Sequence, residues 1–125
     1  MTVERMERVN QSLKEEISNI LQFELQDPRL EFVSITHVAT SRNLQHAKVY
    51  FSVLGDEKKA RIAQEGLNSA TGFIRRIIGK RIRLRYTPEI VFVLDKSIEY
   101  SIDIDEKIER IKSESQKSRS DNQQA

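Results

Sequence analysis

Cysteine is absent from this chain of 125 residues. Its absence excludes disulfide bonds and thiolate metal sites, and it suits a reducing compartment. Long apolar runs are absent as well: the opening stretch MTVERMERVN has no signal-peptide core, and no run approaches the roughly 20 residues of a membrane span. We therefore expect a cytoplasmic protein that is neither exported nor embedded in a membrane.

An excess of either charge is also lacking. Charged residues make up 32% of the chain, yet the formal net charge is only +2, which argues against a uniformly basic nucleic-acid binder. Any surface for nucleic acid must therefore come from a local concentration of cations. The length suits a single domain with an ordinary hydrophobic core.

Groups that could carry out catalysis are few. The sequence contains no GxxxxGK[ST] phosphate-binding loop, and His37 and His46 fall in a predicted hairpin, where structural or surface roles are commoner than metal binding. One acidic group lacks the glycine and the spacing of a calcium-binding EF-hand loop. Its members are Asp103, Asp105, Glu106 and Glu109. We predict no catalysis, no metal site, no cofactor and no small-molecule substrate.

Periodicity predicts the first half of the fold. Between Val3 and Leu25 the apolar residues recur three and four apart, which is typical of a helix with one buried stripe. The stretch QDPRL ends this helix, because a residue before proline is pushed out of the helical region. The stretches FVSITHVA (32–39) and HAKVYFSVL (46–54) predict an antiparallel hairpin, because they are rich in β-branched and aromatic residues and flank a polar turn.

The second half returns to helical spacing. Asp56 is the expected N-cap of a long helix within residues 55–81. Its inward face comprises Ile62, Ala63, Gly66, Leu67, Ala70, Ile74, Ile77 and Ile78. The continuous apolar run in PEIVFVLD (88–95) predicts a third, well-buried strand, and the isoleucines from Ile98 to Ile111 predict a last helix.

These elements predict one α+β domain over residues 1–112, with its helices on one face of a three-stranded sheet. A crossover from one strand through a helix to another strand is nearly always right-handed, which places the long helix on that face. Residues 113–125, SESQKSRSDNQQA, contain no apolar residue except the final alanine. We expect them to form a disordered polar tail.

The stretch SATGFIRRIIGKRIRLR (69–85) carries two glycines and six basic residues but no acid. At 100° per residue on a helix, Gly72, Arg75, Arg76 and Gly79 share the side opposite the apolar face. Each interior glycine costs about 0.8–1 kcal/mol relative to alanine, so two on an exposed face require a reason. Glycine allows close approach of another backbone, and arginine binds phosphate in a bidentate manner. This pattern indicates a cationic surface for nucleic acid.

Structural explanations stand beside this one. Gly79 could end the helix as its C′ residue, and Gly72 could mark a kink at which two helices meet. The cations of residues 80–85 could be the solvated rim of a linker. In an extended segment, however, Arg81, Arg83 and Arg85 would all point the same way.

The order helix, strand, strand, helix, kink, helix, strand resembles the type II KH fold, with SATGFIRRIIGKRIRLRYTPEIVFVLD as its second half. More narrowly, the stretches ERVNQSLKEEISNIL, DPRLEFVSITHV and LDKSIEYSIDIDEKI resemble the ribosome-binding factor A family over effectively the whole folded part. KH domains carry a GxxG loop between their two core helices, and this loop clamps the backbone of single-stranded nucleotides. Here Ala70, Thr71 and Gly72 stand at that junction, as the A-x-G helix kink of the family resembled.

The resemblance implies a monomeric, non-enzymatic ribosome biogenesis factor that binds the free small (30S) ribosomal subunit and its 16S rRNA. It also implies a late precursor subunit as the partner, a role in maturation and processing of the rRNA ends, and the greatest need in the cold. Since the GxxG loop is lost, binding is expected to use basic side chains on structured RNA. The residues expected to bind RNA are Gly72, Arg75, Arg76, Gly79, Lys80, Arg81, Arg83 and Arg85.

Two other functions compete with RNA binding. The basic amphipathic segment 73–85 has a composition that suits an anionic membrane surface. The chain could also be an adaptor whose basic surface docks on an acidic protein partner. Neither alternative accounts for the KH-like order of elements.

Removal of residues 113–125 is expected to shift the melting temperature by no more than about a degree or two, because the segment has no apolar anchor. Thermal unfolding of the full-length and shortened chains checks this. A large loss of stability would show that the folded domain extends beyond residue 112.

Overall fold

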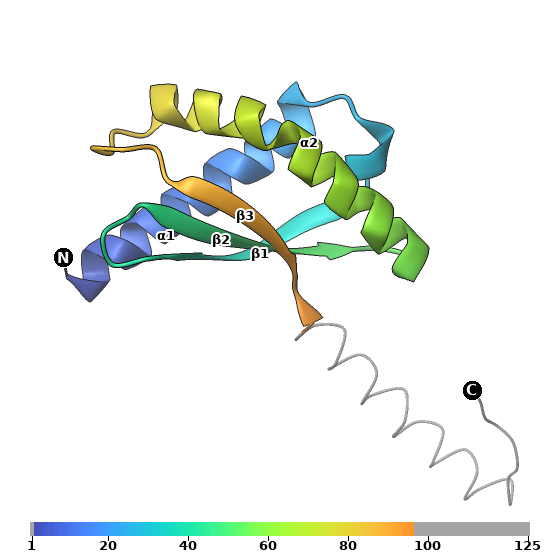
Figure 1. The fold of residues 1–125 in the computed structure, drawn as a ribbon, viewed down its shortest axis with the longest axis horizontal. Coiled ribbons are helices and arrows are strands. Elements are labelled where there is room, and N and C mark those ends of the chain that lie inside the picture. The colour runs from blue at the N-terminus through green and yellow to red at the C-terminus, as the bar shows by residue number, and fades with distance from the viewer. Residues whose placement is uncertain (1, 97–125) are drawn as a thin grey trace, which may run out of the picture. The chain divides into compact units, whose positions relative to one another are not determined.

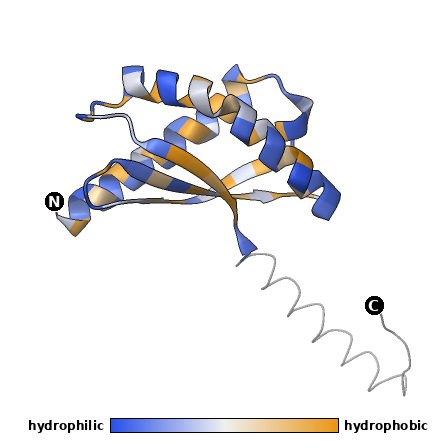
Figure 2. Cartoon of the chain, viewed as in Figure 1, coloured by the Kyte–Doolittle hydropathy of each residue, from blue (hydrophilic) through white to orange (hydrophobic). Residues whose placement is uncertain are grey.

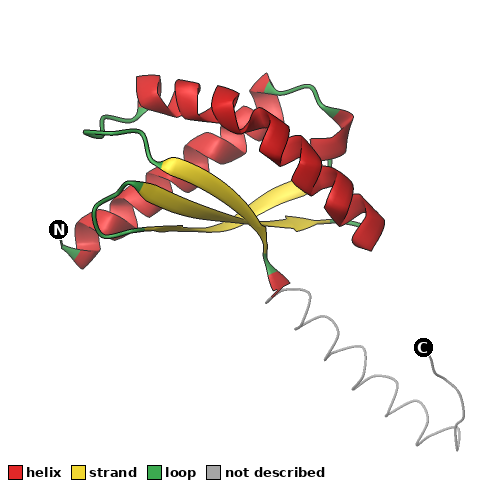
Figure 3. Ribbon diagram, in the orientation of Figure 1, coloured by secondary structure: helices red, strands yellow, loops and turns green. Residues whose placement is uncertain are grey.

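A computed structural model describes residues 2–96 of the chain (Figure 1). Its elements in order are α1 (Val3–Asn19), the π-helical turn η1 (Ile20–Glu24), the 3-10 turn η2 (Pro28–Leu30), β1 (Val33–Thr40), β2 (His46–Val53), α2 (Glu57–Arg81) and β3 (Glu89–Leu94). Helices and a three-stranded sheet confirm the predicted α+β class (Figure 3). The last helix expected around residues 98–111 and the tail 113–125 lie outside the described residues. Between residues 2 and 96, no helix is long and apolar enough to cross a membrane.

The first helix begins and ends as its sequence requires. The hydroxyl of Thr2 caps it by accepting a hydrogen bond from the Arg5 backbone N–H at 3.2 Å. Its buried residues Leu13 and Ile17 belong to the predicted apolar stripe. The last turn widens, because the Leu25 N–H bonds to the Ile20 carbonyl five residues back at 3.0 Å. Helical structure therefore ends at Glu24, ahead of the proline, as predicted.

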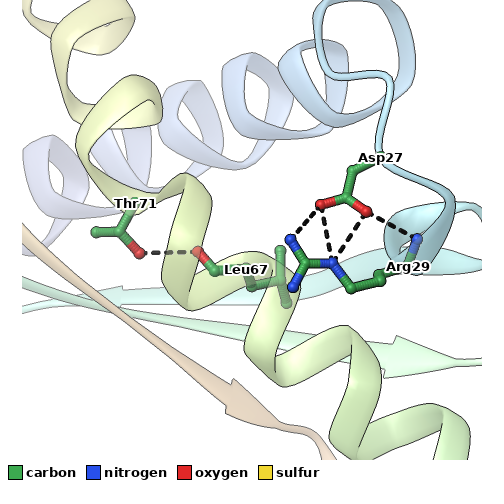
Figure 4. Close-up of polar contacts among 4 residues, drawn as sticks. All are labelled: Asp27, Arg29, Leu67 and Thr71. Carbon is green, nitrogen blue, oxygen red and sulfur yellow. Dashed lines mark hydrogen bonds and ion pairs between the residues drawn. The ribbon is translucent and has the colours of Figure 1, made fainter.

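The turn after α1 is held by an ion pair and packs closely on α2. Asp27 accepts hydrogen bonds from the Arg29 backbone N–H at 2.9 Å and from its guanidinium Nη2 at 2.7 Å (Figure 4). The guanidinium bonds are the main reason that the pKa of Asp27 is lowered. On α2, a Cβ atom added to Gly66 would lie 3.0 Å from Cδ2 of Leu30. The close approach of this turn explains the glycine at position 66.

The hairpin is antiparallel, as predicted, and contains a bulge between Ile35 and His37. Ile35 and Val38 are both buried although they lie three residues apart, which strict alternation of a strand would not allow. The extra residue brings both onto the core face. It also pairs His37 with Tyr50, so that the histidine lies on the opposite face.

The long helix α2 begins at its predicted cap, where Asp56 accepts a hydrogen bond from the Lys59 N–H at 3.0 Å. Six of the eight inward residues assigned from the sequence are buried. They are Ala63, Gly66, Leu67, Ala70, Ile74 and Ile78. Ile77 is partly buried against the core. Ile62 is 37% exposed, so it lies at the edge of the buried face of α2 and not within it.

The break expected within residues 69–72 is not an interruption, because α2 is one helix from Glu57 to Arg81. Gly72 has no positive φ angle, so its backbone conformation is open to any residue. The helix axis bends along its length (Figure 1). The Thr71 hydroxyl donates to the Leu67 carbonyl one turn back at 2.9 Å (Figure 4). Such a bond often bends a helix without breaking it.

The third strand pairs in parallel with β2, giving the order β1-β2-β3. The prediction that β3 is buried throughout is wrong. Its hydropathy is high along almost its whole length (Figure 2), yet Ile90 and Phe92 are buried while Val91 is 58% exposed. The reason is that both described helices pack on the same face of the sheet, so alternate residues face away from the core (Figure 1).

Candidate nucleic-acid interface

The residues expected to bind RNA lie in the last turns of α2 and in residues 82–86, which connect α2 to β3. The side chains there are held in different ways. Some contact other parts of the protein, whereas others remain exposed without a charged partner among the described residues. The structure thus divides the predicted cationic surface into two sets.

Arg75 belongs to the set that holds the fold together. Its Nε donates to the Pro88 carbonyl and its Nη2 to the Thr87 carbonyl, both at 3.0 Å. The side chain is partly buried against the segment that leads into β3. Two of the guanidinium donors expected to meet phosphate therefore bind backbone oxygens of the protein itself.

Arg81 also has partners within the protein. Its Nη1 lies 2.9 Å from Oε1 of Glu16 and 2.6 Å from Oε2 of Glu24, and its Nη2 lies 2.7 Å from the other Glu24 oxygen. This bidentate hydrogen bonding raises the pKa of Arg81 and lowers the pKa of the Glu24 carboxyl below its ordinary value of 4.5. Two carboxylates thus compensate the charge of Arg81. The two ion pairs connect the end of α2 to α1 through Glu16 and to η1 through Glu24.

The sequence predicts that Arg81, Arg83 and Arg85 point the same way from an extended segment. This is wrong for Arg81. Arg81 is the last residue of α2, whereas the residues after it are non-helical. The helix continues this far because the Ile82 N–H still bonds to the Ile78 carbonyl at 2.8 Å. Arg83 and Arg85 are the exposed arginines of the connection.

A contact within the fold explains the glycine at position 79. It lies inside α2 and not at the C′ position that its sequence context allowed. A Cβ atom at this position would lie 2.8 Å from the Thr87 hydroxyl oxygen, so the glycine makes room for the segment before β3. Together with Arg75, it shows that this side of α2 is in part an internal contact.

Four cations of the predicted set remain available. Arg76, Lys80, Arg83 and Arg85 are exposed or nearly so and form no ion pair with another residue in the range 2–96. Arg76 lies 6.0 Å from the Phe73 ring centroid, and Arg85 lies 5.4 Å from that of Tyr86, which is itself 55% exposed. We call these four residues the basic surface.

Gly72 lies on the exposed side of the same helix, within one turn of Arg76. No atom lies within 4 Å of the position that its Cβ would occupy. Its backbone is ordinary helix, so neither conformation nor packing within the described structure calls for glycine. Of its two neighbours at the expected kink, Ala70 faces the core and Thr71 bonds back to Leu67. An external partner that approaches the helix closely would account for Gly72.

Metal ligands do not assemble among the described residues, where no group of three or more histidine or acidic side chains could hold an ion. His37 and His46 are both exposed on the sheet. The acidic group from Asp103 to Glu109 lies outside the described residues.

Comparisons with known proteins agree on one family. The chain matches the family described as ribosome-binding factor A over residues 5–108. The ribosome-binding factor A of Halothermothrix orenii is 45% identical over 119 residues, which cover 95% of this chain and 98% of that protein. The crystal structure of ribosome-binding factor A from Thermus thermophilus superposes with a TM-score of 0.64 at 24% identity, over 71% of this chain and 93% of that one.

A second structural likeness comes from the same organism. It is a homology model of the Thermus thermophilus ribosome-binding factor A, fitted into a cryo-EM map of a complex with the 30S subunit. It matches with a TM-score of 0.58 at 24% identity, over 70% of this chain and 91% of that one. At this identity, both structural matches support the fold.

The Arg81 network predicts an acid-sensitive contribution to stability. Glu24 has a lowered pKa in the folded chain, so its contribution is complete above pH 4.5 and is lost as the pH falls through the folded value. Arg81→Met is expected to lower the free energy of unfolding at pH 7, with the difference from the wild type shrinking below pH 4.5. Urea unfolding across pH 3–7 measures this, and a difference independent of pH would contradict it.

Gly72 and Gly79 form a matched pair within one helix. Gly72→Ala is expected to raise the free energy of unfolding by about 1 kcal/mol, because the new methyl group meets open space and alanine favours helix. Gly79→Ala is expected to gain less, since Thr87 must move to admit the methyl group. Urea denaturation of the two variants gives both values. Equal gains would show that the Thr87 contact carries no cost.

Proposed function

Because the chain belongs to the ribosome-binding factor A family, we propose that it binds the free small (30S) ribosomal subunit through its 16S rRNA. The name of this family describes a binding factor and not an enzyme, in agreement with the expectation of no catalysis. The chain acts in the cytoplasm as a monomer. Its partner is a late precursor of the subunit, and it assists maturation and processing of the rRNA ends, above all in the cold.

The observation that carries this proposal is the basic surface beside Gly72. Four exposed cations without a carboxylate partner among the described residues lie at one end of α2 and in the connection to β3. A phosphate backbone is the ligand that such a group attracts, since each contact releases a bound counterion. A glycine with open space above it permits the close approach that a nucleic-acid backbone requires.

Charge reversal tests the basic surface. The double variant Lys80→Glu with Arg83→Glu is expected to abolish co-sedimentation with purified 30S subunits, because it replaces two cations by two anions. The control is Lys58→Glu with Arg61→Glu, which makes the same change at the same spacing near the other end of α2, also on exposed side chains. Equal losses in both variants would indicate only a dependence on net charge. Unchanged binding of the first variant would refute the proposed site.

Salt dependence supplies a count of the contacts. Four phosphate contacts correspond to a slope of the logarithm of the binding constant against log salt of about −2.8 to −3.6, taking duplex RNA to behave as B-DNA. Arg81→Met is expected to leave this slope unchanged, because its charge is already compensated by Glu16 and Glu24. A slope near zero for the wild type would contradict the proposal.

Substitutions at Gly72 are expected to change stability and subunit binding in opposite directions. The stabilised Gly72→Ala chain is expected to bind the subunit more weakly than the wild type, and Gly72→Val more weakly still. Full binding by both would remove Gly72 from the interface and leave the site to residues 80–86.

A further inference from the structure

The sheet face turned away from the helices is uncovered in the described part of the chain, and its side chains differ from those of an ordinary solvent face. Six residues define what we call the open face: His37, Ala39, Lys48, Tyr50, Val91 and Val93. His37, Lys48 and Val91 are exposed, and Tyr50 is half-buried. Val91, at 58%, is among the most exposed large apolar side chains described.

Strand register arranges these residues in two adjacent rows. His37 and Val93 pair with Tyr50 from either side, and Ala39 and Val91 pair with Lys48 in the same way. Paired residues on neighbouring strands point to the same face. Tyr50 and Lys48 therefore occupy the middle of the open face, about 7 Å apart along β2.

The β1 bulge is what completes this arrangement. Without the extra residue, Thr36 would lie opposite Tyr50, and His37 would turn toward the core. With it, the histidine and tyrosine rings lie 5.5 Å apart, tilted by 35°. The result is a tilted aromatic pair across two strands, next to a lysine.

The chemistry of the two rows favours nucleic acid. They contain an aromatic pair, three aliphatic side chains and one cation, but no carboxylate. Acids flank the two rows: Glu89 pairs with His46 one row before Lys48, and Asp95 follows Val93 by two residues. Aromatic rings on a sheet beside cationic side chains are a recurrent platform for unpaired bases, which stack on the rings while phosphates meet the cations.

We propose that the open face is a second RNA site, which binds unpaired nucleotides by stacking a base on Tyr50 and His37 and pairing a phosphate with Lys48. This inference rests on the proposed function, because a ribosomal partner supplies the RNA. The site is separate from the basic surface, since α2 packs on the opposite face of the sheet (Figure 1). The two surfaces contact different stretches of RNA.

Tyrosine fluorescence tests stacking without disturbing the face. The chain has no tryptophan and three tyrosines, so the double variant Tyr86→Phe with Tyr100→Phe leaves Tyr50 as its one strong fluorophore. Addition of a ten-nucleotide oligouridine RNA is expected to quench this emission to saturation. Lys80→Glu and Arg83→Glu are then added to this double variant. The Tyr50 emission of the resulting chain is expected to be quenched as well, because the basic surface is not needed for stacking. Absence of quenching in the first variant overturns the proposal.

Affinity for the same oligonucleotide provides the second measurement. Tyr50→Ala is expected to weaken binding at least about fivefold. Tyr50→Phe, which keeps the ring, is expected to stay within about twofold. Equal affinity of the alanine variant and the wild type overturns the proposal.

Subunit co-sedimentation separates this inference from the proposed function. If Tyr50→Ala loses the 30S subunit yet binds oligouridine like the wild type, a ribosomal protein covers the face and the RNA proposal fails. If Lys80→Glu with Arg83→Glu still binds the subunit, the proposed function of the basic surface fails. Quenching of Tyr50 then still decides whether the open face binds unpaired RNA.

Discussion

Burial of a single apolar layer between two helices and one face of a three-stranded sheet is the constraint on which the rest of the structure depends. The strand residues that fill this layer are apolar, whereas Thr40 at the end of β1 meets α1 through a hydrogen bond from its hydroxyl to Asn10. Alternate strand residues face away from the layer and need not be apolar. The bulge in β1 is a response to this, because Ile35 and Val38 both need the core face. The same one-sidedness leaves the other face of the sheet to residues such as Tyr50 and Lys48.

Local patterns in the sequence predict the elements well. The three-four spacing of α1, the Asp56 cap and the β-branched stretches of the hairpin each depend on neighbours within a few residues. The errors lie where distant contacts decide. Half-burial of β3 depends on which faces the helices cover, and continuity of α2 through Gly72 depends on a backbone that tolerates a bend.

The candidate site could be predicted only in part, for the same reason. A run of cations shows where positive charge is concentrated, but not which charges the fold itself uses. Arg81 meets carboxylates 57 and 65 residues away, and Arg75 meets carbonyls 12 and 13 residues away. Gly79 and Gly72 look alike in sequence, yet one faces Thr87 and the other faces open space. Only the folded chain distinguishes them.

Parallel pairing of β3 has a consequence for the order in which the chain folds. The hairpin joins neighbouring stretches, whereas His46 pairs with Glu89 across the whole of α2. Closing that longer loop costs more chain entropy, so docking of β3 is expected to follow the hairpin and the helix. Until then, β2 has an unpaired edge, and Gln64 and Arg75 lack the Phe92 and Pro88 carbonyls that they bind in the finished fold. Docking of β3 thus completes both the three-stranded sheet and the contacts of α2 with that strand and the segment before it.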